Sequence, residues 1–69
     1  MPLTKQQEFI KFINKLPLNR YMQIRKSCID NQELAFCSES WNAFMCNNWQ
    51  INETHFKIMW EIVDNTFVN

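Results

Sequence analysis

The sequence predicts an all-α fold, a compact bundle of about four short helices. Three observations predict it. The chain has 69 residues and is 46% hydrophobic, which suits one small globular core. It contains no glycine, a residue on which β-hairpin turns depend. Its apolar residues recur at three- and four-residue intervals instead of alternating. We expect helices at about 5–16, 19–29, 32–47 and 53–66 in a single domain, 1–69, because connections of two to five residues are typical of bundles.

The first two expected helices are separated at Pro17. Thr4 and Gln7 form a capping box that begins the first helix, and Pro17 ends it because proline disfavours the α conformation in the preceding residue. The apolar face of the first helix consists of Phe9, Ile10, Phe12, Ile13 and Leu16. That of the second consists of Leu18, Tyr21, Met22, Ile24, Cys28 and Ile29.

The third and fourth expected helices each begin at an asparagine. Asn31 is placed to cap the third. Asn52 caps the fourth, and Ile51 with Phe56 forms a hydrophobic staple there. The apolar face of the third helix consists of Leu34, Cys37, Trp41, Phe44 and Met45. That of the fourth consists of Phe56, Met59, Trp60, Val63 and Phe67.

The composition excludes several classes of site. Without glycine there is no phosphate-binding loop of the usual kinds. The only histidine, His55, falls in the first turn of the fourth helix and has no triad partner nearby in the sequence. The three cysteines, 28, 37 and 46, lack the close pairing of zinc ligands. We therefore expect no enzyme, no catalytic residue, no metal and no cofactor.

The chain has no apolar run near the ~18 residues that span a bilayer and no signal peptide at its start. We expect a cytoplasmic protein with no membrane association. Its wealth of Asn, Ile, Phe and Lys matches AT-rich codons, which favours a phage or bacterial origin.

Charge is divided unevenly along the chain. Residues 1–27 hold six of the seven basic residues and one acidic residue, whereas residues 28–69 hold one basic and six acidic residues. Such a dipolar surface can orient an oppositely charged partner. The predicted third helix contains no lysine or arginine, so it would read bases poorly as a recognition helix.

Seven residues are candidates for partner binding. Arg25 falls inside the apolar arc of the second expected helix. There its guanidinium group either reaches solvent, pairs with an acidic residue or contacts a partner. Ile58 and Ile62 widen the apolar face of the last helix, which indicates central burial or docking to a second chain. Phe36 lies off its predicted stripe beside Ala43. The remaining candidates are the basic Lys11 and Lys15.

Three segments resemble the small Hha/YmoA modulators. They are Pro2-Leu3-Thr4-Lys5, Phe9-Ile10-Lys11-Phe12 and Asp30-Asn31-Gln32-Glu33-Leu34, and the likeness covers about half of the chain. The resemblance implies a helical, non-enzymatic protein that binds a nucleoid protein. The Ala-Asp-His-Arg stretch of that family is missing, and Glu39-Ser40-Trp41-Asn42 stands in its place.

The function expected first is therefore binding to a protein partner, such as a host protein, or to a second copy of the chain. The protein would then be an accessory regulator or inhibitor. The alternative is a nucleic-acid-associated transcription modulator, either similar to a helix-turn-helix protein or resembling the Hha/YmoA family. A basic stripe would support it, but the balancing acidic half makes nucleic acid the less favoured partner.

Overall fold

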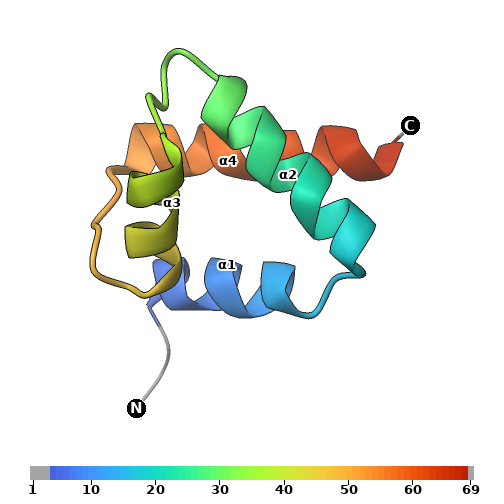
Figure 1. Ribbon diagram of the computed structural model, residues 1–69, viewed down its shortest axis with the longest axis horizontal. Coiled ribbons are helices and arrows are strands. Elements are labelled where there is room, and N and C mark those ends of the chain that lie inside the picture. The colour runs from blue at the N-terminus through green and yellow to red at the C-terminus, as the bar shows by residue number, and fades with distance from the viewer. Residues whose placement is uncertain (1–3, 69) are drawn as a thin grey trace.

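The computed structural model describes residues 4–68, and these form four α-helices with no strand. The helices are α1 (Lys5–Asn14), α2 (Leu18–Asp30), α3 (Ser38–Met45) and α4 (Glu53–Val68) (Figure 1). The all-α prediction is confirmed. Residues 1–3 and 69 lie outside the described part, and with them the Pro2-Leu3 start of the first Hha/YmoA-like segment and both ends of the predicted domain.

Three of the four helices lie where the sequence places them. The Thr4 Oγ1 atom accepts from the Gln7 backbone N–H at 3.1 Å, and Gln7 Oε1 accepts from the Thr4 N–H at 2.9 Å, so the capping box is present. Asn52 Oδ1 accepts from the His55 N–H at 2.8 Å and begins α4. The helix ends differ from the predicted ones by one or two residues, within the usual fraying of a last turn.

The prediction of a helix starting at 32 is wrong: α3 begins at Ser38. Asn31 does act as a cap, since its Oδ1 accepts from the N–H groups of Glu33 and Leu34, but it caps only a turn. Ala35 then has φ 54°, a left-handed conformation that no α-helix continues through. Cys37 is extended, and its N–H donates to Ser40 Oγ at 2.8 Å as a new helix begins.

Just after α3, an asparagine adopts the left-handed backbone conformation that glycine usually takes at the end of a helix. Asn47 has φ 62°, a region that asparagine tolerates better than most residues. Its N–H donates to the Phe44 carbonyl at 2.9 Å, and the Asn48 N–H donates to the Ala43 carbonyl at 2.8 Å. This pair of bonds is a Schellman motif, and it turns the chain towards α4.

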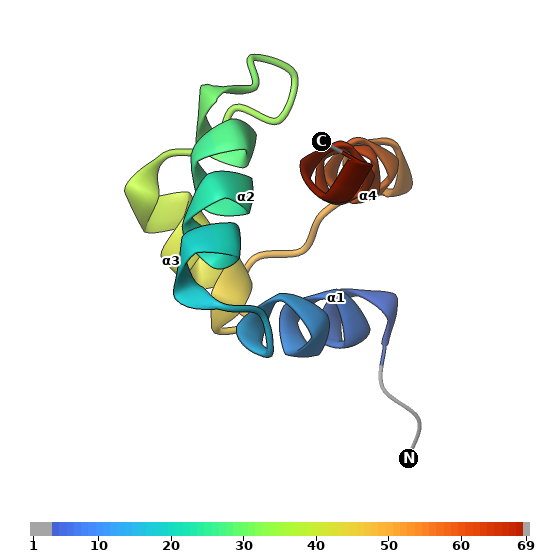
Figure 2. The ribbon, with the colours of Figure 1, turned by 90° about the vertical axis from the view of Figure 1, so that its right-hand side faces the viewer.

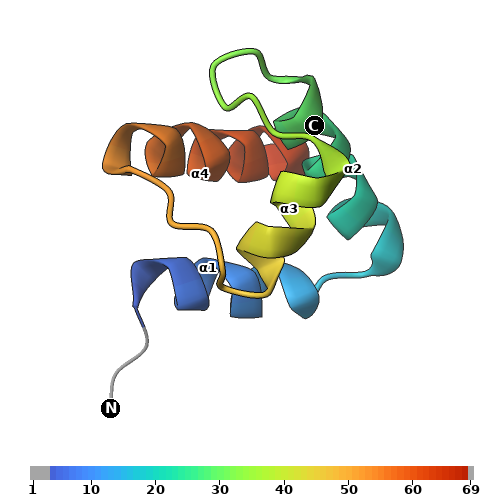
Figure 3. The same ribbon diagram turned by 60° about the vertical axis from the view of Figure 1, so that its left-hand side comes forward.

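The helices surround one aromatic core. In Figures 1 and 3, α1 and α4 run in the same direction, one below the other, while α2 and α3 cross between their levels. Figure 2, which looks nearly along α4, places α2 and α3 together on one side and α4 on the other. The ring of Phe9 lies 5.8 Å from those of Phe44 and Phe56 and 4.9 Å from that of Trp60, centroid to centroid. Phe9 thus joins α1 to α3 and α4 through edge-on aromatic packing.

The structure corrects the expected exposure of several residues. Phe36, expected on the surface, is only 8% exposed and packs against Trp41 and Phe44. The helical spacing that placed it off the stripe does not apply, because it precedes α3. Leu18 and Met22, expected on the buried face of α2, are 74% and 46% exposed. Phe12, Cys37 and Phe67, expected on the apolar faces of the other helices, are exposed as well. Within residues 4–68, every helix is too short or too polar to cross a bilayer.

Candidate functional site

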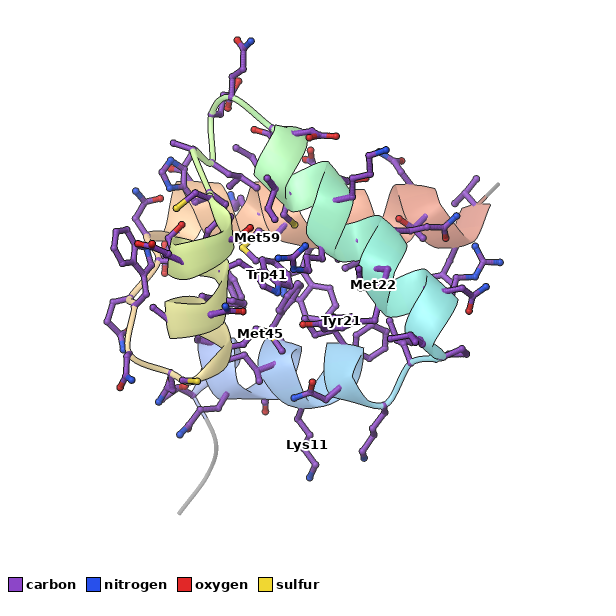
Figure 4. The ribbon with its side chains drawn as sticks, in the orientation of Figure 1. Lys11, Tyr21, Met22, Trp41, Met45 and Met59 are labelled. Atoms are coloured by element: carbon purple, nitrogen blue, oxygen red, sulfur yellow. The ribbon has the colours of Figure 1, made fainter. Side chains whose placement is uncertain are left out.

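An open groove lies between α1 and the end of α3, and we name it the α1/α3 groove. It has a volume of about 510 Å³. Its lining consists of Gln7, Ile10, Lys11, Asn14, Lys15, Met45, Cys46 and Asn47. Figure 4 shows Met45 between α3 and α1, and Lys11 extending from α1 into solvent. The floor of the groove is therefore aliphatic, and its edge carries charge.

Helix α1 presents two different faces because of its periodicity. Gln6, Phe9 and Ile13 are buried in the core. Ile10 is half-buried, whereas Lys11 and Lys15, the C-cap residue directly after α1, are exposed. Side chains three and four residues apart share a helix face, so the groove-lining residues of α1 form one stripe beside its buried stripe.

A buried glutamine holds the far end of the groove in place. Gln6 is 8% exposed, and its Nε2 donates to Asn47 Oδ1 at 3.2 Å and to the Trp49 carbonyl at 2.8 Å. Its Oε1 accepts from the Ile51 N–H at 3.3 Å. The amide thereby fixes the α3–α4 connection against α1. The sequence-based prediction missed Gln6, although a polar residue on the stripe of Phe9 and Ile13 is the signal that could have revealed it.

The charge of this groove is of one sign. Lys11 and Lys15 line it, and no carboxylate is among its described lining residues. A second hollow, between α1 and α4, has a volume of about 390 Å³ and mixes both signs. Its charged lining residues are Lys5, Glu8, Lys57, Glu61 and Asp64. Of these two surfaces, only the α1/α3 groove combines an aliphatic floor with lysines at its edge and no carboxylate among its described lining residues.

The seven candidate residues do not gather at one place. Lys11 and Lys15 come together in the α1/α3 groove. The exposed position expected for Phe36 is wrong because its ring is buried, and Ala43 is half-buried in α3. Ile58 and Ile62 are half-buried and pack against the core, which accounts for the breadth of the apolar face of α4.

Among residues 4–68, the contact that Arg25 makes is a hydrogen bond and not an ion pair with a helix carboxylate. It is half-buried, and its Nη2 donates to Ser38 Oγ, at the start of α3, at 3.4 Å. The bond spans α2 and α3, so Arg25 helps to join these two helices.

Arg20 and Lys5, two other basic residues of the N-terminal half, lie at separate surfaces. Arg20 Nη1 donates to Gln23 Oε1 and to the Thr66 carbonyl, both at 3.3 Å, and its guanidinium lies 5.6 Å from the ring centre of Phe67. Lys5 lines the mixed hollow between α1 and α4. A nucleic-acid site needs a basic stripe on one face, and these positions do not make one with Lys11 and Lys15.

The three thiols have three different environments. Cys28 is fully buried, and desolvation raises its pKa from 9.0 to about 12. Cys37 is exposed, and hydrogen bonds from the Ser40 side chain and from nearby backbone lower its pKa. Cys46 is exposed in the α1/α3 groove. No three His, Cys, Asp or Glu residues of the described chain converge as metal ligands would.

The sequence matches no protein-family model, no curated protein and no solved structure. The likeness to the Hha/YmoA family therefore remains a resemblance of three short segments.

Proposed function

We propose that this chain is a non-enzymatic helical protein that binds a partner protein through the α1/α3 groove. In this proposal it acts in the cytoplasm as an accessory regulator or inhibitor, encoded by a phage or a bacterium. The observation that carries the proposal is the groove itself, where half-buried Ile10 and Met45 lie beside exposed Lys11 and Lys15.

Two properties of the groove suit a macromolecular partner. Aliphatic side chains that remain accessible in a chain this small supply the apolar contacts from which binding energy at interfaces mainly comes. The lysines at its edge supply charges that orient a partner and speed its approach. The groove is open to solvent beside α1, so a partner segment can lie across it.

The test compares two variants that carry the same substitution. Met45→Glu places a carboxylate in the groove, whereas Met22→Glu places one on α2, where Met22 is 46% exposed and is not among the groove-lining residues. Tagged wild-type protein and both variants are used for affinity capture from extracts of the cells that encode the chain. A partner retained by wild type and Met22→Glu, and lost with Met45→Glu, supports the proposal.

Circular dichroism and thermal melting accompany the capture, because Met45 also packs against the core. If Met45→Glu is unfolded, Cys46→Glu replaces it, since Cys46 is exposed in the same groove. Equal capture by folded groove variants and wild type would show that the groove is not the binding surface.

A further inference from the structure

We infer that the segment bound in the α1/α3 groove is an acidic amphipathic α-helix of the partner protein. The inference rests on the proposed function, and it adds the conformation and the charge of the occupant. Three features of the groove lead to it: its backbone surroundings, the spacing of its lysines and the chemistry of its floor.

The surroundings of the groove favour a helical occupant. An extended peptide gains its affinity by pairing with an exposed strand edge, and residues 4–68 contain no strand. A proline-rich peptide docks on aromatic side chains, but the apolar floor here is formed by Ile10 and Met45. A helix needs neither, because its own backbone hydrogen bonds are satisfied and it presents apolar side chains from successive turns.

The two lysines favour an acidic occupant. Lys11 lies in the last turn of α1, and Lys15 is its C-cap with a right-handed helical backbone. The two are four residues apart, a spacing that places both on one side of the helix about one turn from each other. A neighbouring helix with two carboxylates one turn apart has the same repeat of about 5.4 Å. No carboxylate is among the described lining residues of the groove, whereas three carboxylates line the hollow between α1 and α4 together with two other lysines.

The floor of the groove accepts aliphatic side chains of varied shape. Methionine is unbranched and adapts to the surface it meets, and Met45 is half-buried at the end of α3. A volume of about 510 Å³ lies within the range of binding pockets. It admits apolar side chains from adjacent turns of one face of a helix, while the carboxylates of that helix reach the lysines.

The test is a selection from a displayed library of random 16-residue peptides on the immobilised full chain. Peptides that also bind Met45→Glu are removed, so that the selection reports on the groove. We expect the enriched sequences to combine a helical spacing of apolar residues with an excess of Asp and Glu. The most enriched peptide is then synthesised, and its Kd is measured by fluorescence anisotropy.

Two double variants distinguish specific contacts with the groove lysines from a general effect of the net charge of the chain. Lys11→Gln/Lys15→Gln and Lys26→Gln/Lys57→Gln remove the same charge, but only the first pair lies in the groove. We expect the first double variant to raise the Kd about tenfold, and the second to leave it within about twofold. Circular dichroism of both variants checks the fold, because lysines near the end of α1 also interact favourably with the helix dipole.

The outcomes separate this inference from the proposed function. Groove-dependent peptides without an acidic excess, or with an equal response to both double variants, would overturn the inference and leave the proposed function standing. Absence of any peptide sensitive to Met45→Glu would overturn both. Two further probes decide between occupants. Groove-dependent binding of a 20-base-pair duplex, or a dimer that Met45→Glu disrupts, would assign the groove to nucleic acid or to a second copy and overturn the inference.

Discussion

The side-chain amide of Gln6 donates a hydrogen bond to Asn47 Oδ1 across 41 positions of the sequence. The two residues belong to the first turn of α1 and to the left-handed end of α3. Gln6 also satisfies the Trp49 carbonyl and the Ile51 N–H, so one buried amide fixes a connection without regular structure. Because Asn47 lines the α1/α3 groove, the shape of the groove depends on this contact.

Replacing Gln6 by methionine tests that dependence. Gln6→Met preserves the length of the side chain but leaves three polar partners without their hydrogen bonds. We expect the free energy of unfolding to fall by about 1–3 kcal/mol, measured by urea denaturation. Trp49, already 51% exposed, should become more accessible to acrylamide quenching as the connection loosens. Gln50→Met is the control, because Gln50 is exposed and its substitution should leave both measurements unchanged.

What the sequence predicted well was local. The capping boxes and caps at Thr4 and Asn52 depend only on residues three apart, and both are present. The region 32–37 was predicted wrongly because its apolar spacing satisfies a helix, while the side chain of Asn31 and the left-handed Ala35 break one. The role of Gln6 depends on long-range contacts, which no local pattern contains.

The groove was predictable only in part, for the same reason. The choice of Lys11 and Lys15 followed from the excess of charge in the N-terminal half. That Met45 and Cys46 lie beside them follows from the packing of α3 on α1. The helical spacing of the third expected helix placed Met45 on its buried face, and it could not indicate which side of Met45 stays accessible.

Because Phe36 is buried, its replacement should lower the stability of the fold. Phe36→Ala removes a ring that packs against Trp41 and Phe44, so we expect a loss of about 3 kcal/mol or more in the free energy of unfolding. That is a large share of the stability of a small domain. Phe67→Ala is the comparison, since Phe67 is 47% exposed and should lose much less. A Phe36→Ala protein with the urea midpoint of wild type would contradict the core position of this ring.

Ala35 offers a stabilising substitution. Its φ of 54° brings the Cβ atom close to its own backbone, a strain of about 1–2 kcal/mol that glycine does not have. Glycine loses more conformational entropy on folding, so we expect Ala35→Gly to raise the free energy of unfolding by about 0.5–1 kcal/mol. The same change at Ala43, inside α3, should lower it by about 1 kcal/mol. If both changes lower stability, the left-handed turn is not the conformation of residue 35 in solution.

The three thiols should react in a definite order. The thiolate is the reactive form, so the exposed, low-pKa Cys37 should react fastest with iodoacetamide near neutral pH, followed by exposed Cys46 and then by buried Cys28. Peptide mapping by mass spectrometry assigns the rates. Ser40→Ala removes the hydroxyl that contacts Cys37 Sγ at 3.5 Å, and should slow Cys37 while leaving Cys46 unchanged. Equal slowing at both thiols would indicate a general change in structure.

Alkaline pH should weaken the fold through Cys28. The pKa of this thiol is about 12 in the folded chain, against an ordinary value of 9.0, because burial disfavours the thiolate. Above pH 9 the unfolded chain releases this proton while the folded chain keeps it. The unfolded state then binds fewer protons, so stability falls as pH rises from about 9 towards 12.

Urea denaturation of wild type and Cys28→Ala at pH 8, 9, 10 and 11 measures this effect. Cys28→Ala is less stable at pH 8 because it leaves a cavity, but the variant lacks the titrating thiol. We therefore expect the two free energies of unfolding to converge above pH 9, by at most about 1.4 kcal/mol for each pH unit. Curves that stay parallel up to pH 11 would mean that the Cys28 thiol ionises in the folded chain as readily as in the unfolded one, and hence that water reaches it between α2 and the core.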